Sequence, residues 1–507
     1  MFKNTTFLTL SFIVFWFSAC MPYQEEQLTE VNPDSRDSIC QQIFTFQDEQ
    51  NAAALYPYFH HKNPTYRYLS VLAFASIKEE KAIDSLVVLL NDKVDKVGAA
   101  AAFSLGQIGS ATATEGLVAA FAQSDTSGLN KQTNSAILEA VGKCGDESFL
   151  NHLSSITTYQ SSDTLLLEGQ AWGIYRYALR NIISPSGTQR MLDLLSGDNM
   201  PNSVRVIAAN YLFRAKNVHL DSLNTIKVAN IFKTEQDARI RMALAVAIGK
   251  SKTTEAYQAL SGVLENEKDY RVVCNIIRSL GNFPYQQSQP LIQPLLKNKN
   301  KHIAIRAAQH FVENGVPQDA SAYWNWAKEE MPWQTQISLY AAANKHLPTY
   351  FVNQRNNINA ELRYRFISSE NPYEKAACLK ALAEFGWNYR YVYREGVALK
   401  EKYPILGTTG VESLAAISDA ENFRNLFNTS SNYVTRELAA SFKEAIETGD
   451  AGVAPEIKLA IQIELRRLHG TFKRNSTETT LLNRLARCFA RGTKLVGCFV
   501  RITHCRR

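Results

Sequence analysis

The chain has 507 residues, of which 45% are apolar and 20% charged, with eight cysteines and a formal net charge of +7. It is too long for one compact core and too poor in cysteine for a disulfide-rich fold, so we expect several domains or a repeat array. Residues 466–507 hold 11 Lys or Arg against the single acid Glu478, which leaves residues 1–465 with a net charge of −3. This slightly acidic body gives no electrostatic footprint for nucleic acid, so no nucleic-acid partner is expected.

The first residues have the pattern of an export signal. A positive start precedes an apolar run that ends in small residues and is too short to anchor a protein stably across a bilayer. The sequence FSAC at residues 17–20 resembles the lipobox of bacterial lipoproteins, with Phe17 in place of the usual Leu. The resemblance implies that residues 1–19 are a lipoprotein signal peptide and that Cys20 carries the lipid; the alternative is an ordinary signal with a chance cysteine.

The residues after Cys20 bear on localisation. The stretch QEE at residues 24–26 is similar to the acidic signal that sends some lipoproteins of Bacteroidota to the cell surface. We therefore expect a cell-envelope protein that its lipid holds to the outer membrane, on the periplasmic side or at the surface. Residues 20–63 are expected to form a linker and a first helix.

A repeated helix follows this linker. Small and aliphatic residues recur at three- and four-residue steps, as in a helix packed closely on its neighbours, in residues 97–109 (VGAAAAFSLGQIG), 240–252 (IRMALAVAIGKSK) and 272–283 (VVCNIIRSLGNF). A second amphipathic helix comes after each of them, starting at Thr114, Thr254 and Ser288. The repeat unit is therefore an antiparallel helical hairpin.

Glycines near the ends of the first helices mark the repeat. They are expected to stop these helices, and they stand at Gly106, Gly142, Gly249, Gly281, Gly315, Gly386 and Gly449. Directly adjacent members are 36, 32 or 34 residues apart. This period predicts an all-α superhelix, an α-solenoid of about a dozen hairpins, regular over residues 64–315 and divergent over residues 316–468. Its concave surface is expected to be lined by the second helices.

These repeats resemble the HEAT-like repeats also found in phycobilisome lyases, whose consensus resembles VRxAAAxALGxIG. The matching arginine is Arg205 in SVRVIAANYL and Arg241 in IRMALAVAIG, whereas Gly98 replaces it in the first repeat quoted above. The resemblance covers most of the chain after Cys20 and implies HEAT-type hairpins. It also implies a bilin lyase as one activity, but export argues against this, because chromophores are attached in the cytoplasm.

Residues 316–432 depart from the repeat pattern and are rich in aromatic residues. Large side chains at helical spacing are usually buried, so irregular core packing is one interpretation. The other is an exposed binding surface, because aromatic residues dominate contact energy at interfaces. The candidate binding residues are Trp324, Trp326, Trp333, Trp387, Tyr389, Tyr391 and Tyr393.

No spacing typical of a reaction occurs: HExxH, CxxC, GxSxG, P-loop and GxGxxG patterns are absent. One group of metal-ligand types has irregular spacing inside the basic end and predicts no zinc site: Cys488, Cys498, His504 and Cys505. Buried thiols are expected at Cys144, Cys274 and Cys378. We therefore expect no catalytic residue, no metal and no cofactor.

The sequence favours a non-catalytic scaffold that binds protein partners. The main alternative is the helical stalk of a peptidyl-prolyl isomerase, because similar lipoproteins of Bacteroidota carry a cyclophilin-type domain after HEAT repeats. A helical glycan-binding lipoprotein of the SusD type is disfavoured, since its TPR pattern is missing. Residues 469–507 form a basic tail, either non-native sequence after a shifted frame or an arm for nucleic acid or anionic lipid.

Overall fold

The computed structural model describes residues 30–121, 128–348 and 350–385, with nine further residues between 388 and 409. Helices joined by short connections form this part of the chain, and no strand occurs in it, which confirms the predicted all-α fold. None of the helices among these residues is both long and apolar enough to cross a membrane. The chain divides into unit 1, Met1–Ser251, and unit 2, Lys252–Arg507, and each is described by itself.

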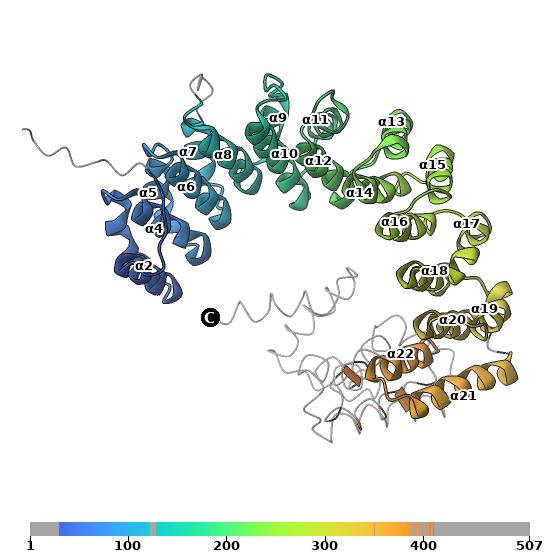
Figure 1. The fold of residues 1–507 in the computed structure, drawn as a ribbon. Coiled ribbons are helices and arrows are strands. Elements are labelled where there is room, and N and C mark those ends of the chain that lie inside the picture. Colours follow the sequence, from blue (N-terminus) through green and yellow to red (C-terminus); the bar gives the residue numbers. More distant parts are fainter. Residues whose placement is uncertain are drawn as a thin grey trace, which may run out of the picture. The chain divides into compact units, whose positions relative to one another are not determined.

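Unit 1 is a series of antiparallel helical hairpins (Figure 1). Its helices are α2 Ser38–Asp48, α3 Ala52–Leu55, η1 Tyr56–His60, α4 Pro64–Ile77, η2 Glu80–Ala82, α5 Ile83–Leu89, α6 Asp95–Ile108, α7 Ala113–Ala120, α8 Lys131–Cys144, α9 Glu147–Ser155, α10 Thr164–Leu179, α11 Pro185–Ser196, α12 Asn202–Arg214, α13 Ser222–Thr234 and α14 Ala238–Gly249. From α4 onwards the first helix of each hairpin packs on the first helix of the next.

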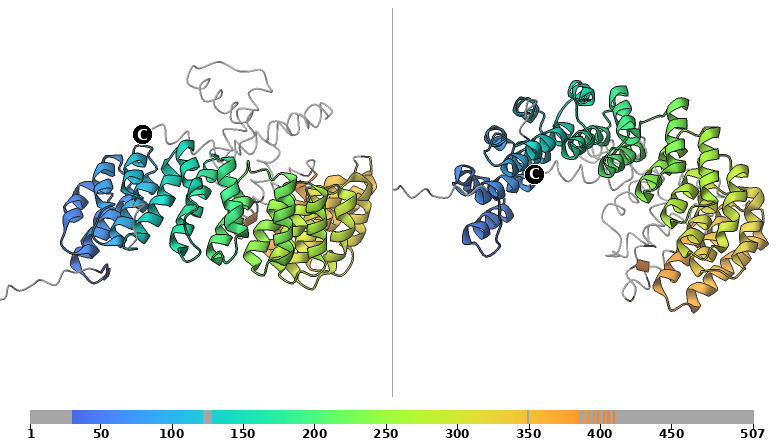
Figure 2. Two further views of the ribbon diagram at one scale, coloured as in Figure 1. Left: turned by 90° about the horizontal axis from the view of Figure 1, so that it is seen from above. Right: turned by 45° about the horizontal axis from the view of Figure 1, so that its top comes forward.

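The two helices of each hairpin lie on opposite sides of unit 1. The first helices, α4, α6, α8, α10, α12 and α14, follow the inner side of its curve, and α7, α9, α11 and α13 follow the outer side (Figures 1 and 2). The expectation that second helices line the concave surface is therefore wrong. The first helices carry the Ala- and Gly-rich faces that let backbones approach closely, so they pack more tightly and take the shorter side of the curve.

Side chains of neighbouring repeats complete the ends of these helices. Asp95 of α6 accepts hydrogen bonds from the backbone N–H groups of Gln132 and Thr133, at 2.9 and 2.8 Å, and so caps the start of α8. At the other end, Lys250 donates to three carbonyl oxygens around the end of α12, at 2.6 to 3.0 Å. Arg180 does the same for α8 through the carbonyls of Gly142 and Gly145. These contacts supply partners that a lone helix end lacks.

The arginine of the repeat consensus has a defined structural role in unit 1. Arg241 donates to the carbonyl oxygens of Glu235 and Gln236, which follow the outer helix α13. Arg205 donates to the carbonyl of Leu195 at the end of α11. The same kind of contact is made by Arg67 of α4, which donates to the carbonyls of His61 and Lys62. Each arginine thus fixes the connection that leads into its own helix.

Two of the predicted glycine stops have another role. Gly106 and Gly142 lie inside α6 and α8 rather than after them, and α6 ends at Gly109, which has a φ of 73°. A Cβ on Gly106 would stand 3.1 Å from the Cα of Ala140, so this glycine allows α6 and α8 to approach closely. In unit 2 the prediction holds for Gly281 and Gly315, which directly follow α16 and α18.

Unit 2 continues the same hairpin pattern. Its helices are α15 Thr254–Leu264, α16 Tyr270–Leu280, α17 Tyr285–Ile292, η3 Gln293–Lys297, α18 Lys301–Asn314, η4 Pro317–Asp319, α19 Ala320–Ala327, α20 Trp333–His346, α21 Val352–Ser368 and α22 Pro372–Ala383. The helix predicted from Ser288 begins earlier, as α17, and becomes the 3-10 helix η3, because Pro290 and Pro294 supply no backbone N–H. Repeats predicted beyond residue 409, with Gly449, lie outside the described residues.

The predicted thiols are at the helix interfaces. Cys144 and Cys378 are buried and Cys274 is half-buried, and all three are free. Burial raises the pKa of the Cys144 thiol to about 11 and that of Cys378 to about 12, so both stay protonated.

Candidate binding surface on the inner helices of unit 1

Aromatic and charged side chains lie on four successive inner helices of unit 1. We call this set the inner strip, and it consists of Phe103 on α6, Glu139 and Lys143 on α8, Trp172 and Arg176 on α10, and Phe213 and Arg214 on α12. All seven are at least partly exposed.

The strip begins with contacts between α6, α8 and α10. The Lys143 ammonium lies 5.0 Å from the ring centroid of Phe103 and 3.0 Å from Glu139. Arg176 donates to the same carboxylate at 2.8 and 2.9 Å, so Glu139 joins two cations from neighbouring repeats. These charged groups are partly shielded from water, which makes their geometry more defined than that of a free surface pair.

The second half of the strip lies on α10 and α12. The Arg176 guanidinium lies 5.0 Å from the Trp172 ring, and that ring stacks on Tyr175 at 5.5 Å with an interplanar angle of 21°. Tyr175 is buried, and its burial raises the pKa of the phenol although Arg214 and Arg176 oppose the shift. Arg214 is exposed and lies 5.7 Å from the Phe213 ring. Among the described residues no carboxylate pairs with Arg214.

This arrangement suits contact with another chain. Aromatic rings that contact ordered cations present a large, rigid surface and lose little side-chain entropy on binding. Residues of this kind are typical of interface hot spots. The sequence contains one signal for the strip, since Lys143, Arg176 and Arg214 recur 33 and 38 residues apart, close to the repeat period. Spacing alone does not show which side of the helices they share.

The three described tryptophans of the predicted aromatic surface in unit 2 make separate contacts. Trp326 packs on Phe311 and Tyr323, with ring centroids 5.4 and 5.6 Å away, which is core packing. Trp324 is half-buried beneath the Lys328 ammonium, 3.5 Å from its ring centroid, and Trp333 is the half-buried first residue of α20. No ring contact joins any two of these tryptophans.

Tyr391 is the other predicted aromatic residue that the structure describes. Its ring lies 6.3 Å from that of Phe366 and beneath the Arg363 guanidinium, at 4.5 Å. Trp387, Tyr389 and Tyr393 lie outside the described residues, as do Cys20 and the cysteine and histidine group between 488 and 505. In the described part of the chain no group of three His, Cys, Asp or Glu side chains is placed to hold a metal ion.

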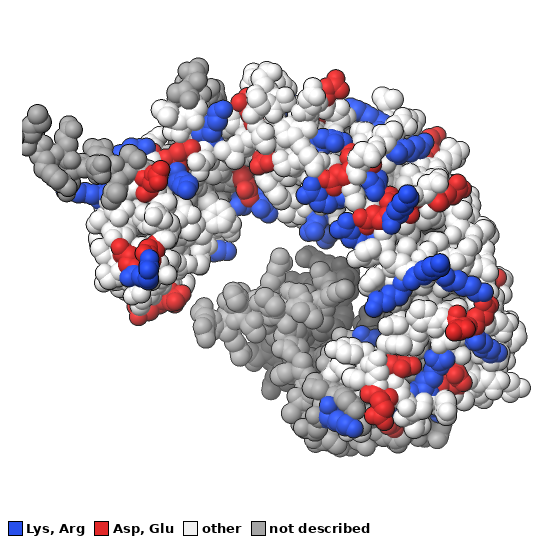
Figure 3. Space-filling model, in the orientation of Figure 1, with Lys and Arg blue, Asp and Glu red and all other residues white. Residues whose placement is uncertain are grey.

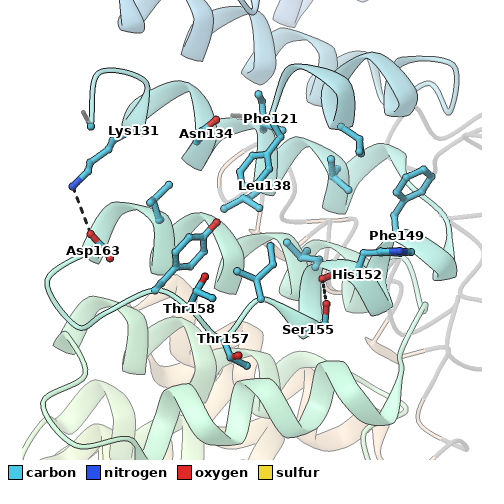
Figure 4. A pocket seen from close by; sticks show the side chains of 18 residues that line it. Phe121, Lys131, Asn134, Leu138, Phe149, His152, Ser155, Thr157, Thr158 and Asp163 are labelled. Atoms are coloured by element: carbon cyan, nitrogen blue, oxygen red, sulfur yellow. Dashed lines mark hydrogen bonds and ion pairs between the residues drawn. The ribbon is translucent and has the colours of Figure 1, made fainter. Parts of the chain in front are cut away.

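Unit 1 also contains a pocket of about 880 Å³ between α7, α8, α9 and the connection to α10 (Figure 4). Its walls are mixed, with apolar Phe121, Leu138 and Phe149 beside polar residues such as Asn134 and His152. The ion pair between Lys131 and Asp163, at 3.5 Å, lies at one side. This volume is in the range of pockets that bind small molecules.

Comparison with known proteins agrees with the repeat architecture. A family model for HEAT repeats matches residues 52–133, which contain the hairpins α4–α5 and α6–α7. Together with the hairpins observed from α4 onwards, this confirms the predicted α-solenoid of HEAT-type hairpins. No curated protein matches the chain.

Two solved structures are similar at low identity. An engineered protein has a TM-score of 0.38 and 16% identity, over 66% of this chain and 98% of that one. The crystal structure of Kap121p has a TM-score of 0.43 and 10% identity, over 88% of this chain. The match spans about half of Kap121p, 52% of its length.

Proposed function

We propose that this protein is a non-catalytic scaffold of the bacterial cell envelope and that it binds a protein partner on the inner helices of unit 1. The inner strip is the observation that supports the proposal. Contacts between successive repeats join Phe103 to Lys143 and Glu139 to Arg176, and every residue of the strip remains at least partly exposed. A solenoid presents such residues at regular intervals, which suits a partner that contacts several repeats at once.

We propose further that a lipid on Cys20 holds the scaffold to the outer membrane. The support is the lipobox-like sequence before Cys20. Helix α2 begins at Ser38, so the chain between Cys20 and Ser38 separates the lipid from this helix. A tether of this kind would leave the inner helices accessible while keeping the protein at the membrane surface.

Purification of the full chain with its partner tests the binding function. The wild-type protein should retain a defined partner, and Trp172→Ala and Arg214→Glu should lose most of it. The matched control is Lys233→Glu, at an exposed position of the outer helix α13. Equal recovery from all four proteins would remove the support for binding at the inner helices.

A further inference from the structure

The chemistry of the inner strip also indicates what kind of partner segment it takes. The strip contains three cations and one carboxylate, and the carboxylate of Glu139 is already shared by Lys143 and Arg176. Arg214 has no acidic partner among the residues that the structure describes. Figure 3 shows Lys and Arg side chains recurring along the inner side of unit 1. A local positive charge thus lies on a body whose net charge is −3 over residues 1–465.

Cations near helix C-termini have an ordinary structural explanation, because they stabilise the helix dipole. That explanation accounts fully for Arg180 and Lys250, whose side chains donate to the carbonyls at the ends of α8 and α12. Stabilisation of helix ends does not explain the positions of Lys143, Arg176 and Arg214 in this way. Within the described ranges none of these three donates to a carbonyl, and each lies over an aromatic ring at the surface.

The spacing of the inner helices sets the geometry of a bound segment. Packed helices are about 9 Å apart, and an extended chain advances about 3.3 Å per residue. An extended segment that crosses α6, α8, α10 and α12 would therefore advance by about three residues from one helix to the next. About ten residues would cover all four helices, with carboxylates near Arg176 and Arg214 and apolar side chains on the faces of Phe103, Trp172 and Phe213.

We propose that the inner strip binds an extended acidic segment of a partner protein, about ten residues long, whose apolar side chains pack on the strip's aromatic rings. This inference rests on the proposed function and narrows it to one class of partner sequence. Attraction between the acidic segment and the cations of the strip speeds association and fixes the register of the segment on the helices. Contacts with the aromatic rings supply most of the affinity.

Three labelled twelve-residue peptides test the inference against the full chain by fluorescence anisotropy. One alternates pairs of Glu with pairs of Leu, so that each face of the extended peptide carries both kinds of side chain. The second replaces Leu by Ser, and the third replaces Glu by Lys. The Glu–Leu peptide should bind at least tenfold more tightly than the other two, and its affinity should fall as sodium chloride rises from 50 to 300 mM.

The basic residues 466–507 will also attract acidic peptides, so binding alone is not diagnostic. The decisive comparison is between variants that keep this segment. Arg214→Glu should weaken the Glu–Leu peptide at least tenfold and Arg214→Gln by less, whereas Lys233→Glu should change its affinity less than twofold. Unchanged helical circular dichroism and melting temperature would show that the variants are folded.

Two results would overturn the inference: equal binding of the Lys–Leu peptide, or no effect of Arg214→Glu. If recovery of the partner depends on Trp172 while the affinity of the acidic peptide does not depend on Arg214, the partner segment is not acidic, and the scaffold function stands. If neither the partner nor the peptide depends on the strip, the proposed function fails as well.

Discussion

Gly142 of α8 and Gly173 of α10 approach so closely that a Cβ on Gly142 would stand 2.2 Å from the carbonyl oxygen of Gly173. A backbone oxygen has no room to move away, so a methyl group there must push the two helices apart. We expect Gly142→Ala to lower the free energy of unfolding by about 2 kcal/mol or more. Urea denaturation followed by circular dichroism measures this change.

Gly262 is the matched control, because it lies inside α15 and a Cβ there would meet nothing within 4 Å. Alanine is favoured over glycine within a helix by about 0.5–1 kcal/mol, so Gly262→Ala should be stabilising. If the two substitutions had effects of the same sign and size, close helix approach would not be the role of Gly142.

Arg67 and Asp92 form a buried ion pair that fixes the hairpin α4–α5 to the start of α6. The two side chains are each 6% exposed, and two hydrogen bonds of 2.7 and 2.8 Å join them. Asp92→Ala leaves the guanidinium buried without its carboxylate and should cost about 3–5 kcal/mol. In contrast, Asp34→Ala, which breaks the exposed pair with Arg36, should cost less than about 1 kcal/mol. Similar losses for both variants in thermal denaturation would refute this assignment.

His310 of α18 makes the stability of unit 2 depend on pH. It is fully buried, and burial, assisted by the charge of Arg306, lowers its pKa from 6.5 to about 4. The unfolded chain therefore takes up a proton before the folded one does on acidification. The stability that neutral His310 provides is present above pH 6.5 and is lost between pH 6.5 and about 4, at about 1 kcal/mol per pH unit.

His310→Gln should flatten this part of the pH profile. Glutamine does not titrate, and it retains a donor for Ser288 Oγ, which now lies 3.3 Å from the imidazole Nε2. Denaturant midpoints measured from pH 7 to pH 4 give the slope of each protein. His152→Gln on the surface of α9 is the control, and an unchanged slope for His310→Gln would show that other groups govern the pH dependence.

The period of small and aliphatic residues was enough to predict the helices of these hairpins, because that pattern is local. The role of Gly142 was not predictable, since it depends on Gly173, which belongs to the next repeat. The inner strip escaped prediction for the same reason: Glu139 and Arg176 are 37 residues apart and meet only when repeats stack. Trp326 was a candidate binding residue but packs on Phe311, because an aromatic-rich sequence pattern does not distinguish core from surface.

Lipid attachment makes a prediction about Cys20. The wild-type protein should incorporate a clickable fatty acid in growing bacterial cells. It should also partition with membranes, because each buried CH₂ of an acyl chain contributes about 0.8 kcal/mol to membrane binding. Cys20→Ser removes the acceptor thiol and should abolish both labelling and partitioning. The control is Cys40→Ser, in helix α2, which should retain the label. Labelling that survives Cys20→Ser would rule out the proposed anchor.

The most direct test of the scaffold proposal asks which side of unit 1 a partner contacts. A photoreactive p-benzoylphenylalanine can replace Phe103, on the inner helix α6, or Leu223, a 77% exposed residue of the outer helix α13. Irradiation of cells should give a discrete covalent adduct from position 103 and none from position 223. An adduct from position 223 alone would contradict partner binding on the inner helices.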